Sequence, residues 1–238
     1  MILPTFFEPK QIATPGDLVA EGEYFAGENT YKEDKRIYAN RTGIVEYDNK
    51  TVNIVALKSF YMPKPGDIII GTVVGIGFNG WTIDLNGPYQ AFLRPSDVLS
   101  RPFKPQKDEL SQVLDIGDLV VAKIVSYDRT HDPQITVAEP GLGKITRGQI
   151  IKITPTKIPR VIGKKGSMIS MIKEETGCQI ILGLNGVVLV TGKTPDEEQA
   201  ALMAIHKIEE ESHTSGLTDR ITQMLKKEKS KREEAKNE

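Results

Sequence analysis

The stretch "IPRVIGKKGSMISMIKEETG", residues 158–177, decides the fold of the second half of this chain. Two glycines, Gly163 and Gly166, bracket a pair of lysines. After the second glycine, apolar residues recur at helical spacing until Gly177, a residue type that commonly ends helices. The pattern predicts a short helix, a bare and positively charged turn, and a second helix.

Three interpretations compete for the turn "GKKG". A mononucleotide-binding P-loop needs four residues between its glycines, followed by Lys and Ser or Thr, whereas this turn has two residues and continues Ser-Met. A plain turn between helices and a clamp for a nucleic-acid backbone remain. We favour the clamp, because Gly163 and Gly166 carry no Cβ that would hold a sugar-phosphate backbone away. The helix N-terminus behind them favours phosphate, and Lys164 and Lys165 add mobile positive charge.

The charge of the chain is segregated around this turn. The formal net charge is −1, which argues against a nucleic-acid ligand, but phosphate binding depends on the local field. Residues 140–173 contain no Asp or Glu, and acidic residues collect elsewhere, as in "EGEYFAGENTYKED" and "PDEEQ". The basic residues of this block are Lys144, Arg147, Lys152, Lys157, Arg160, Lys164, Lys165 and Lys173.

The composition is that of an ordinary soluble protein. The 238 residues are 39% hydrophobic and 26% charged, which suits two or three compact units. The single cysteine, Cys178, stands in the apolar context "GCQIILG" and is expected to be a small core residue. Since no internal disulfide, signal pattern or membrane-length apolar run is present, we expect a cytoplasmic protein that does not contact a membrane.

The chain before residue 140 is predicted to be rich in β-strands. In residues 1–64 the strand candidates are 36–46 and 51–57, joined by the turn "YDNK". Residues 65–139 have a repeated Gly-Asp turn and five short apolar runs bounded by glycine and proline. Those runs are 67–76, 81–85, 90–93, 119–127 and 134–138. Five short strands with glycine turns fit a small closed barrel of the OB type.

Residues 140–215 alternate between strand and helix patterns. "GQIIKITP" predicts a strand, and "TKIPRVI" predicts a short helix before the glycine turn. "CQIIL" and "VVLVT" predict a hairpin around "GLNG", and a capping box at Thr194 opens a last helix. The predicted order is β-α-α-β-β-α. Residues 216–238 are expected to form a charged tail, either a frayed helix or disordered.

The segment "RVIGKKGSMISMIKEETGCQI" resembles the KH family over some twenty residues, and the order of elements matches its eukaryotic-type arrangement. A KH glycine turn clamps about four nucleotides of single-stranded nucleic acid. The apolar residues beside the turn could line a groove for unstacked bases. The RNA-binding residues that we predict here are Arg160, Ile162, Gly163, Lys164, Lys165, Gly166, Ser167 and Ile169.

The middle segment is similar to the RNA-binding OB domain first described in ribosomal protein S1. The shared pattern is a Gly-Asp opening, a glycine-aromatic second strand, "FLRPSD", and a second Gly-Asp before a long strand. Such barrels stack bases on aromatic side chains in a basic groove. Asn79 and Thr82 replace usual aromatics and Arg94 replaces the usual histidine, so we expect a weaker stacking platform that relies on charge. The candidates are Phe78, Trp81, Phe92, Arg94 and Lys123, of which Trp81 and Phe92 could equally be core residues.

The order of an N-terminal β-unit, an S1-type barrel and a KH domain resembles the cap subunits of the archaeal RNA-degrading exosome. The expected fold class is multidomain α+β. The resemblance implies three copies on a hexameric ring of phosphorolytic exoribonuclease subunits, alone or with a second type of cap subunit. The N-terminal unit would dock on the ring, and the other units would bind single-stranded RNA.

No enzyme chemistry is expected from the residues. His131, His206 and His213 have neither metal-ligand spacing nor a Ser or Cys partner, and the carboxylates lie in solvated runs. We predict no catalytic residue, no metal and no cofactor. The alternatives that stay open are a free-standing RNA-binding factor in translation or RNA processing and, more remotely, a hydrolytic nuclease.

Overall fold

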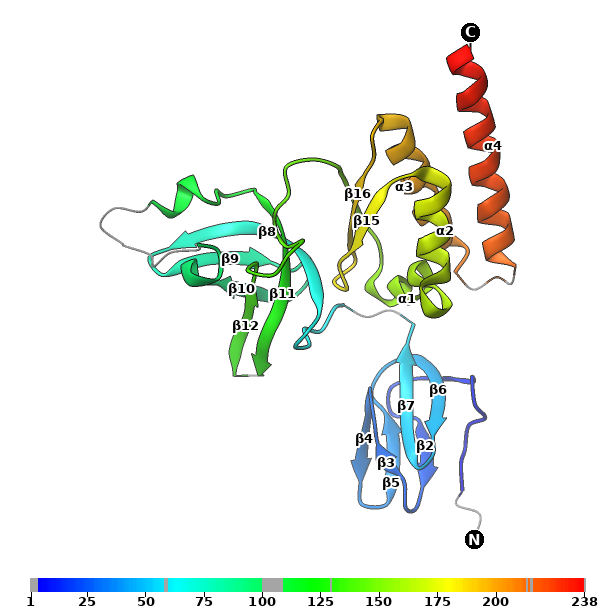
Figure 1. Ribbon diagram of the computed structural model, residues 1–238. Coiled ribbons are helices and arrows are strands. Elements are labelled where there is room, and N and C mark those ends of the chain that lie inside the picture. The colour runs from blue at the N-terminus through cyan, green and yellow to red at the C-terminus, as the bar shows by residue number, and fades with distance from the viewer. Residues whose placement is uncertain are drawn as a thin grey trace. The chain divides into compact units, whose positions relative to one another are not determined.

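The computed structural model describes residues 4–57, 60–99, 109–128, 130–212, 214 and 216–237. The chain divides into two compact units, Met1–Ser59 and Phe60–Glu238. The first is built from strands, and the second combines a barrel with a helical region (Figure 1).

The first unit consists of two small sheets around one core. One sheet has the order β2 (Leu18–Glu21), β5 (Arg36–Ala39), β4 (Thr30–Glu33), and the other has the order β1 (Ile12–Ala13), β6 (Gly43–Asp48), β7 (Thr51–Ala56), β3 (Phe25–Ala26). Small and β-branched residues fill the core, namely Ala13, Val19, Ala20, Ile37, Ala39, Val45, Val52 and Ile54.

The predicted single strand 36–46 is wrong, because β5 and β6 belong to different sheets. The chain leaves the first sheet at Asn40, whose N–H donates to the carbonyl of Asn29, and enters the second at Gly43. A Cβ at Gly43 would collide with the carbonyl oxygen of Val55. An uninterrupted β-type composition predicts extended backbone, but it does not mark where the chain changes sheets.

The five-stranded OB-type barrel predicted for the middle of the chain is confirmed. Its strands follow the order β12 (His131–Thr136), β10 (Gln90–Leu93), β9 (Gly80–Asp84), β8 (Ile68–Gly77), β11 (Leu119–Asp128), and pairing of β12 with β11 closes it. A short strand β13 (Gly143–Lys144) pairs with β11. Trp81 lies at the centre of the core, and its indole N–H donates to the carbonyl of Leu114 at 2.9 Å.

Three Gly-Asp turns open β2, β8 and β11 in the same way. In each, the aspartate carboxylate accepts a hydrogen bond from the backbone N–H three residues earlier, at 2.7–3.2 Å. The preceding glycine has a φ of 92° or 93°, a conformation that favours glycine. The pairs are Gly16–Asp17, Gly66–Asp67 and Gly117–Asp118. The repeated dipeptide in the sequence therefore marks a repeated turn.

The β-α-α-β-β-α order predicted for the KH region is confirmed. Its strands form a three-stranded antiparallel sheet in the order β14 (Gln149–Lys152), β16 (Val187–Thr191), β15 (Gln179–Leu182). The helices are η3 (Pro155–Lys157), α1 (Ile158–Ile162), η4 (Lys164–Gly166), α2 (Ser167–Thr176) and α3 (Pro195–Glu210). Cys178 is buried in the core of this region, as its apolar context predicted.

The segment expected to be a frayed or disordered tail is a long helix, α4 (Leu217–Asn237). Leu217, Ile221 and Leu225 follow one stripe of this helix and are buried in the KH core. The helical alternative is confirmed, but the expected fraying is wrong for these turns, because the prediction weighed the high overall charge and missed three apolar residues spaced four apart. The KH region thus has a fourth helix (Figure 1).

The turn between β15 and β16 joins the KH sheet to the barrel. The Asn185 side chain is fully buried there, accepting from the N–H of Ile70 at 3.2 Å and donating to the carbonyls of Ile70 and Leu85 at 2.8 and 3.0 Å. Beside it, Ile70 and Val121 of the barrel pack against Val187 and Leu189 of the KH sheet. The barrel and the KH region therefore form one unit.

Candidate nucleic-acid interface

The glycine turn between α1 and α2 is tight and irregular. Gly163 has φ 74° and ψ 176°, which ends α1 after its N–H bonds to the carbonyl of Pro159 at 2.9 Å. Lys165 and Gly166 follow with φ values of 54° and 81°. A 3.2 Å hydrogen bond from the N–H of Gly166 to the carbonyl of Gly163 closes the turn. Three residues with positive φ within four positions explain why the sequence needs glycine here.

The two glycines have different surroundings. A Cβ on Gly163 would lie 2.6 Å from Cβ and 2.8 Å from N of Met168, whereas a Cβ on Gly166 would have nothing within 4 Å. From the sequence, both glycines were expected to leave room for a sugar-phosphate backbone. The geometry makes Gly163 a packing requirement of the turn and leaves Gly166 as the position where another molecule can approach the backbone.

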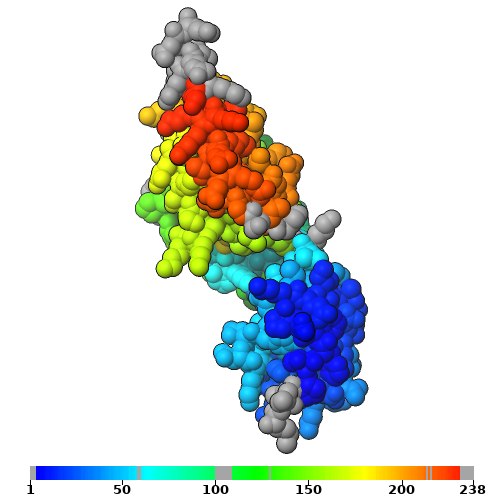
Figure 2. All heavy atoms as spheres, turned by 90° about the vertical axis from the view of Figure 1, so that its right-hand side faces the viewer, coloured from blue at the N-terminus to red at the C-terminus, as the bar shows by residue number. Residues whose placement is uncertain are grey.

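The cationic side chains of the turn are exposed. Within the part of the chain that the structure describes, Arg160, Lys164 and Lys165 have no acidic partner. The yellow-green atoms of α1 and α2 reach the surface beside the orange and red atoms of α3 and α4 (Figure 2). Because none of these charges is compensated within the described chain, the turn can attract phosphate strongly at low ionic strength.

The start of α2 adds backbone donors to the turn. No side chain caps the helix at Gly166, and Ser167 is exposed. Ile162 and Ile169, on the two helices that flank the turn, are half-buried and pack against the KH core. The positive end of the helix dipole suits a phosphate, and the apolar side chains beside it suit the face of a base.

On the barrel, closure brings together residues from three strands. Thr82 of β9 pairs with Phe92 of β10, and Phe92 pairs with Gln134 of β12, so these three side chains share one face. Arg94 extends this face and donates to the Gln134 side chain at 2.8 Å. Sequence reasoning found Phe92 and Arg94 but missed Gln134, because its strand meets β10 only when the barrel closes.

Other predicted barrel residues lie elsewhere. Trp81 is 0% exposed, so no base can stack on it, and its core alternative is the correct one. Phe78 is 79% exposed in the turn between β8 and β9, next to Gly80, whose Cβ position would lie 3.1 Å from the Phe92 ring. Lys123 is engaged with Glu139 at 2.7 Å. The exposed aromatic candidates are therefore Phe78 and the half-buried Phe92.

The expectation that the barrel relies on charge stays a prediction. Residues 65–139 contain ten acidic and six basic residues. Several of these charges hold the barrel itself, as in the pair of Asp118 with Lys144. Hydrogen bonds from Lys144 and from the Asp115 N–H lower the pKa of Asp118. The barrel face offers apolar and hydrogen-bonding groups with one arginine.

The described residues contain no group of three His, Cys, Asp or Glu side chains that could hold a metal ion. Asp128 and His131 lie together in an exposed turn, where hydrogen bonds from Thr130 and His131 lower the pKa of Asp128 to about 2. His206 lies on α3 at 3.7 Å from Glu209, and His213 lies outside the described residues. No described helix has the length and apolarity to span a membrane.

An OB-type barrel joined to a KH domain with an intact glycine turn defines the class of S1/KH RNA-binding proteins. Family models agree with each part of the chain. Residues 10–58 match the exosome RNA-binding protein RRP4 N-terminal domain, residues 60–126 match the RRP4 S1 domain, and residues 148–212 match the KH domain.

Similar proteins narrow the class to one family. The chain is 45% identical to the exosome complex component Rrp4 of Thermofilum pendens, over 91% of this chain and 92% of the relative. It is 44% identical to that of Methanothermobacter thermautotrophicus, over 91% and 68%. A crystal structure described as that of a proposed exosome complex RNA-binding protein superposes with a TM-score of 0.69 at 42% identity, over 73% of this chain and 99% of that one. The chain belongs to the Rrp4 family of archaeal exosome components.

Proposed function

We propose that the chain is a non-catalytic cap subunit of an archaeal exosome, which captures single-stranded RNA and guides it to a ring of phosphorolytic 3′–5′ exoribonuclease subunits. The observation that carries the proposal is the uncompensated glycine turn of the KH region. It is held on the same unit as a barrel whose face carries the half-buried Phe92, and a separate all-β unit precedes both. The family of the chain supports the same assembly.

The glycine turn is suited to the RNA backbone. Gly166 leaves room for a sugar-phosphate chain, and the N–H groups of the first turn of α2 point the positive end of the helix dipole at it. Lys164 and Lys165 supply charge without the cost of breaking an ion pair to any residue that the structure describes. These contacts read the backbone, so they accept many sequences.

The N-terminal unit carries a surface suited to a protein partner. Ile12, Ile44 and Val55 lie side by side across β1, β6 and β7, because Ile12 pairs with Ile44 and Ile44 with Val55. Ile12 and Val55 are 56% and 47% exposed. We assign docking on the ring to this unit, with three copies of the chain per ring, alone or beside a second type of cap subunit. Apolar side chains exposed in a row are typical of interaction surfaces.

The first test compares two pairs of adjacent exposed lysines in the full chain. Lys164 and Lys165 are both replaced by Asp, which tolerates the left-handed backbone at residue 165. In the control, Lys226 and Lys227 on the exposed side of α4 are replaced by Glu, which gives the same charge change. Binding to single-stranded oligo(A) RNA is titrated at several salt concentrations.

The turn variant should bind RNA at least about tenfold more weakly, and its log–log salt slope should flatten by about 0.7 per lost phosphate contact. The control variant should keep the affinity and slope of the parent chain. Equal affinity in the turn variant would reduce the glycine turn to scaffolding.

The second test addresses the assembly. When it is co-expressed with the phosphorolytic ring subunits of an archaeal exosome, the full chain should elute together with the ring in size-exclusion chromatography. The ring should then degrade RNA more efficiently with the chain bound than without it. An isolated chain of about 26 kDa that never joins the ring would favour a free-standing RNA-binding factor. RNA cleavage by the isolated chain would contradict a non-catalytic role.

A further inference from the structure

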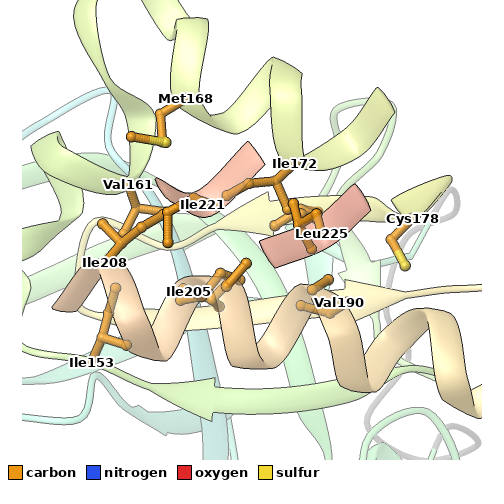
Figure 3. Close-up of a cluster of buried hydrophobic side chains, with 14 of the residues drawn as sticks. Ile153, Val161, Met168, Ile172, Cys178, Val190, Ile205, Ile208, Ile221 and Leu225 are labelled. Atoms are coloured by element: carbon orange, nitrogen blue, oxygen red, sulfur yellow. The ribbon is translucent and has the colours of Figure 1, made fainter. Parts of the chain in front are cut away.

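The fourth helix of the KH region packs against the helix that follows the glycine turn. Ile221 and Leu225 of α4 are 0% and 2% exposed, and they enter the core that α2 and α3 share. Figure 3 shows Ile221 on the side of this core where Val161 and Met168 lie, whereas Leu225 lies toward Ile172 and Cys178. Along α4, Ile221 therefore sits near the end of α2 that carries the turn.

Met168 is the residue of this buried cluster that packs on the turn. It is the second residue of α2 and is 5% exposed. Gly163 packs so closely on it that a Cβ on the glycine would lie 2.6 Å from the Met168 Cβ. Packed side chains transmit small displacements, because a close-packed interior has little free volume to absorb them. Ile221 and Met168 thus belong to one buried cluster, and Met168 in turn packs on Gly163.

The turn has little of its own to hold its shape. Two short-range backbone hydrogen bonds close it, from the N–H of Gly166 to the carbonyl of Gly163 at 3.2 Å and from the N–H of Ser167 to the carbonyl of Lys164. Its two glycines have the largest conformational freedom of any residue type. Lys165 adopts a left-handed conformation that is unfavourable for a lysine. Segments of this kind depend on their surroundings for a single conformation.

We propose that Ile221 is a positioning residue for the glycine turn, so that the RNA-binding element of this chain extends from the turn into α4. It acts through Met168 and does not touch RNA. This inference rests on the proposed role of the turn as an RNA clamp. It places a functional residue of α4 beyond residues 148–212, where the match to the KH family ends.

The test uses two substitutions in the same helix of the full chain. Ile221→Ala and Leu225→Ala each remove a buried branched side chain from the same core, so both should lower the melting temperature by similar amounts. Only Ile221→Ala removes support behind Met168. We expect it to weaken binding of single-stranded oligo(A) RNA about tenfold, against less than about twofold for Leu225→Ala.

Hydrogen exchange distinguishes a local loosening of the glycine turn from a general loss of stability. Amides of residues 164–166 should exchange faster in Ile221→Ala than in Leu225→Ala at equal distance below the respective melting temperatures. Ile221→Val, which removes one methyl group, should restore most of the affinity. If Ile221→Ala does not fold, hydrogen exchange at residues 164–166 is compared between Ile221→Val and Leu225→Val, because exchange responds to a smaller loss of packing than RNA affinity does.

Equal RNA affinity and equal exchange in the two alanine variants would overturn the inference and leave α4 as plain core. The turn variant with Lys164 and Lys165 replaced by Asp separates this failure from that of the proposed function. If that variant binds RNA poorly while the alanine variants behave alike, only the role of Ile221 is wrong. If it binds RNA normally, the clamp itself is wrong.

Discussion

The glycine turn of the KH region and the face of the barrel are two candidate RNA surfaces on one unit, and they differ in how they use charge. On the turn, Lys164 and Lys165 have no acidic partner within the described residues. On the barrel, Arg94 donates to Gln134 and Lys123 pairs with Glu139. The turn is suited to phosphates and the barrel face to bases. Salt should therefore weaken the first contact and spare most of the second.

The largest effect is expected from the two glycines. Gly163→Ala forces a Cβ against the backbone of Met168 at a positive φ, and we expect it to lower the free energy of unfolding by about 3 kcal/mol or more. Gly166→Ala meets no atom and carries only the cost of its positive φ, about 1 kcal/mol. Urea unfolding followed by the fluorescence of Trp81, the one tryptophan of the chain, measures both. Equal losses of the free energy of unfolding in the two variants would show that Gly163 is no more a packing requirement than Gly166.

An intermediate effect is expected on the barrel face. Phe92→Ala removes the central aromatic ring of the row Thr82, Phe92 and Gln134, and it should weaken single-stranded RNA binding by about 1–2 kcal/mol. The salt slope should stay that of the parent chain, because no phosphate contact is lost. Val125→Ala, an exposed apolar truncation on β11, serves as the control. A flatter salt slope in Phe92→Ala than in the parent chain would show that the barrel face, like the glycine turn, binds RNA through its phosphates.

The smallest effect concerns the charges that hold the barrel. The pKa of Asp118 is lowered in the folded chain, chiefly by the hydrogen bond from Lys144. The ionised carboxylate therefore stabilises the fold above the ordinary aspartate pKa, and this stabilisation is lost as pH falls through the lowered value. Since both side chains are partly exposed, Asp118→Asn should lower the melting temperature at neutral pH by only about 2 °C.

The same variant should flatten the pH dependence of the melting temperature in the acid range. An unchanged acid profile would mean that this ion pair contributes nothing to the barrel.

Much of the fold followed from local patterns in the sequence. Strand periodicity with glycine and proline turns located the five barrel strands, and helix signals located α1, α2 and α3. The break between β5 and β6, the role of Gln134 and the burial of Asn185 were beyond local reasoning. Asn185 bonds to Ile70, a residue 115 positions away, and nothing in the tetrapeptide "GLNG" distinguishes a turn in solvent from one in a protein interior.

Part of the candidate site, too, could be predicted from the sequence and part could not. The type and spacing of residues identified the glycine turn, but they could not show that Gly163 packs on Met168 while Gly166 is open. Trp81 and Phe92 are both aromatic residues in strands, and only the facing of each strand separates the buried ring from the half-exposed one. Such distinctions depend on which side of a strand faces the core, and a one-residue shift in register reverses them.

The covered KH sheet has a consequence for how such proteins can change over generations. Val187 and Leu189 lie where a KH domain that travels alone would present polar side chains to water, and the barrel supplies their counterpart in Ile70 and Val121. A genetic exchange that replaced either domain with that of a distant relative would leave two apolar surfaces that do not fit each other. It would also leave Asn185 without its hydrogen-bond partners in the barrel. A replacement of one domain is therefore expected to need matching changes in the other, at the residues where the barrel packs against the KH sheet.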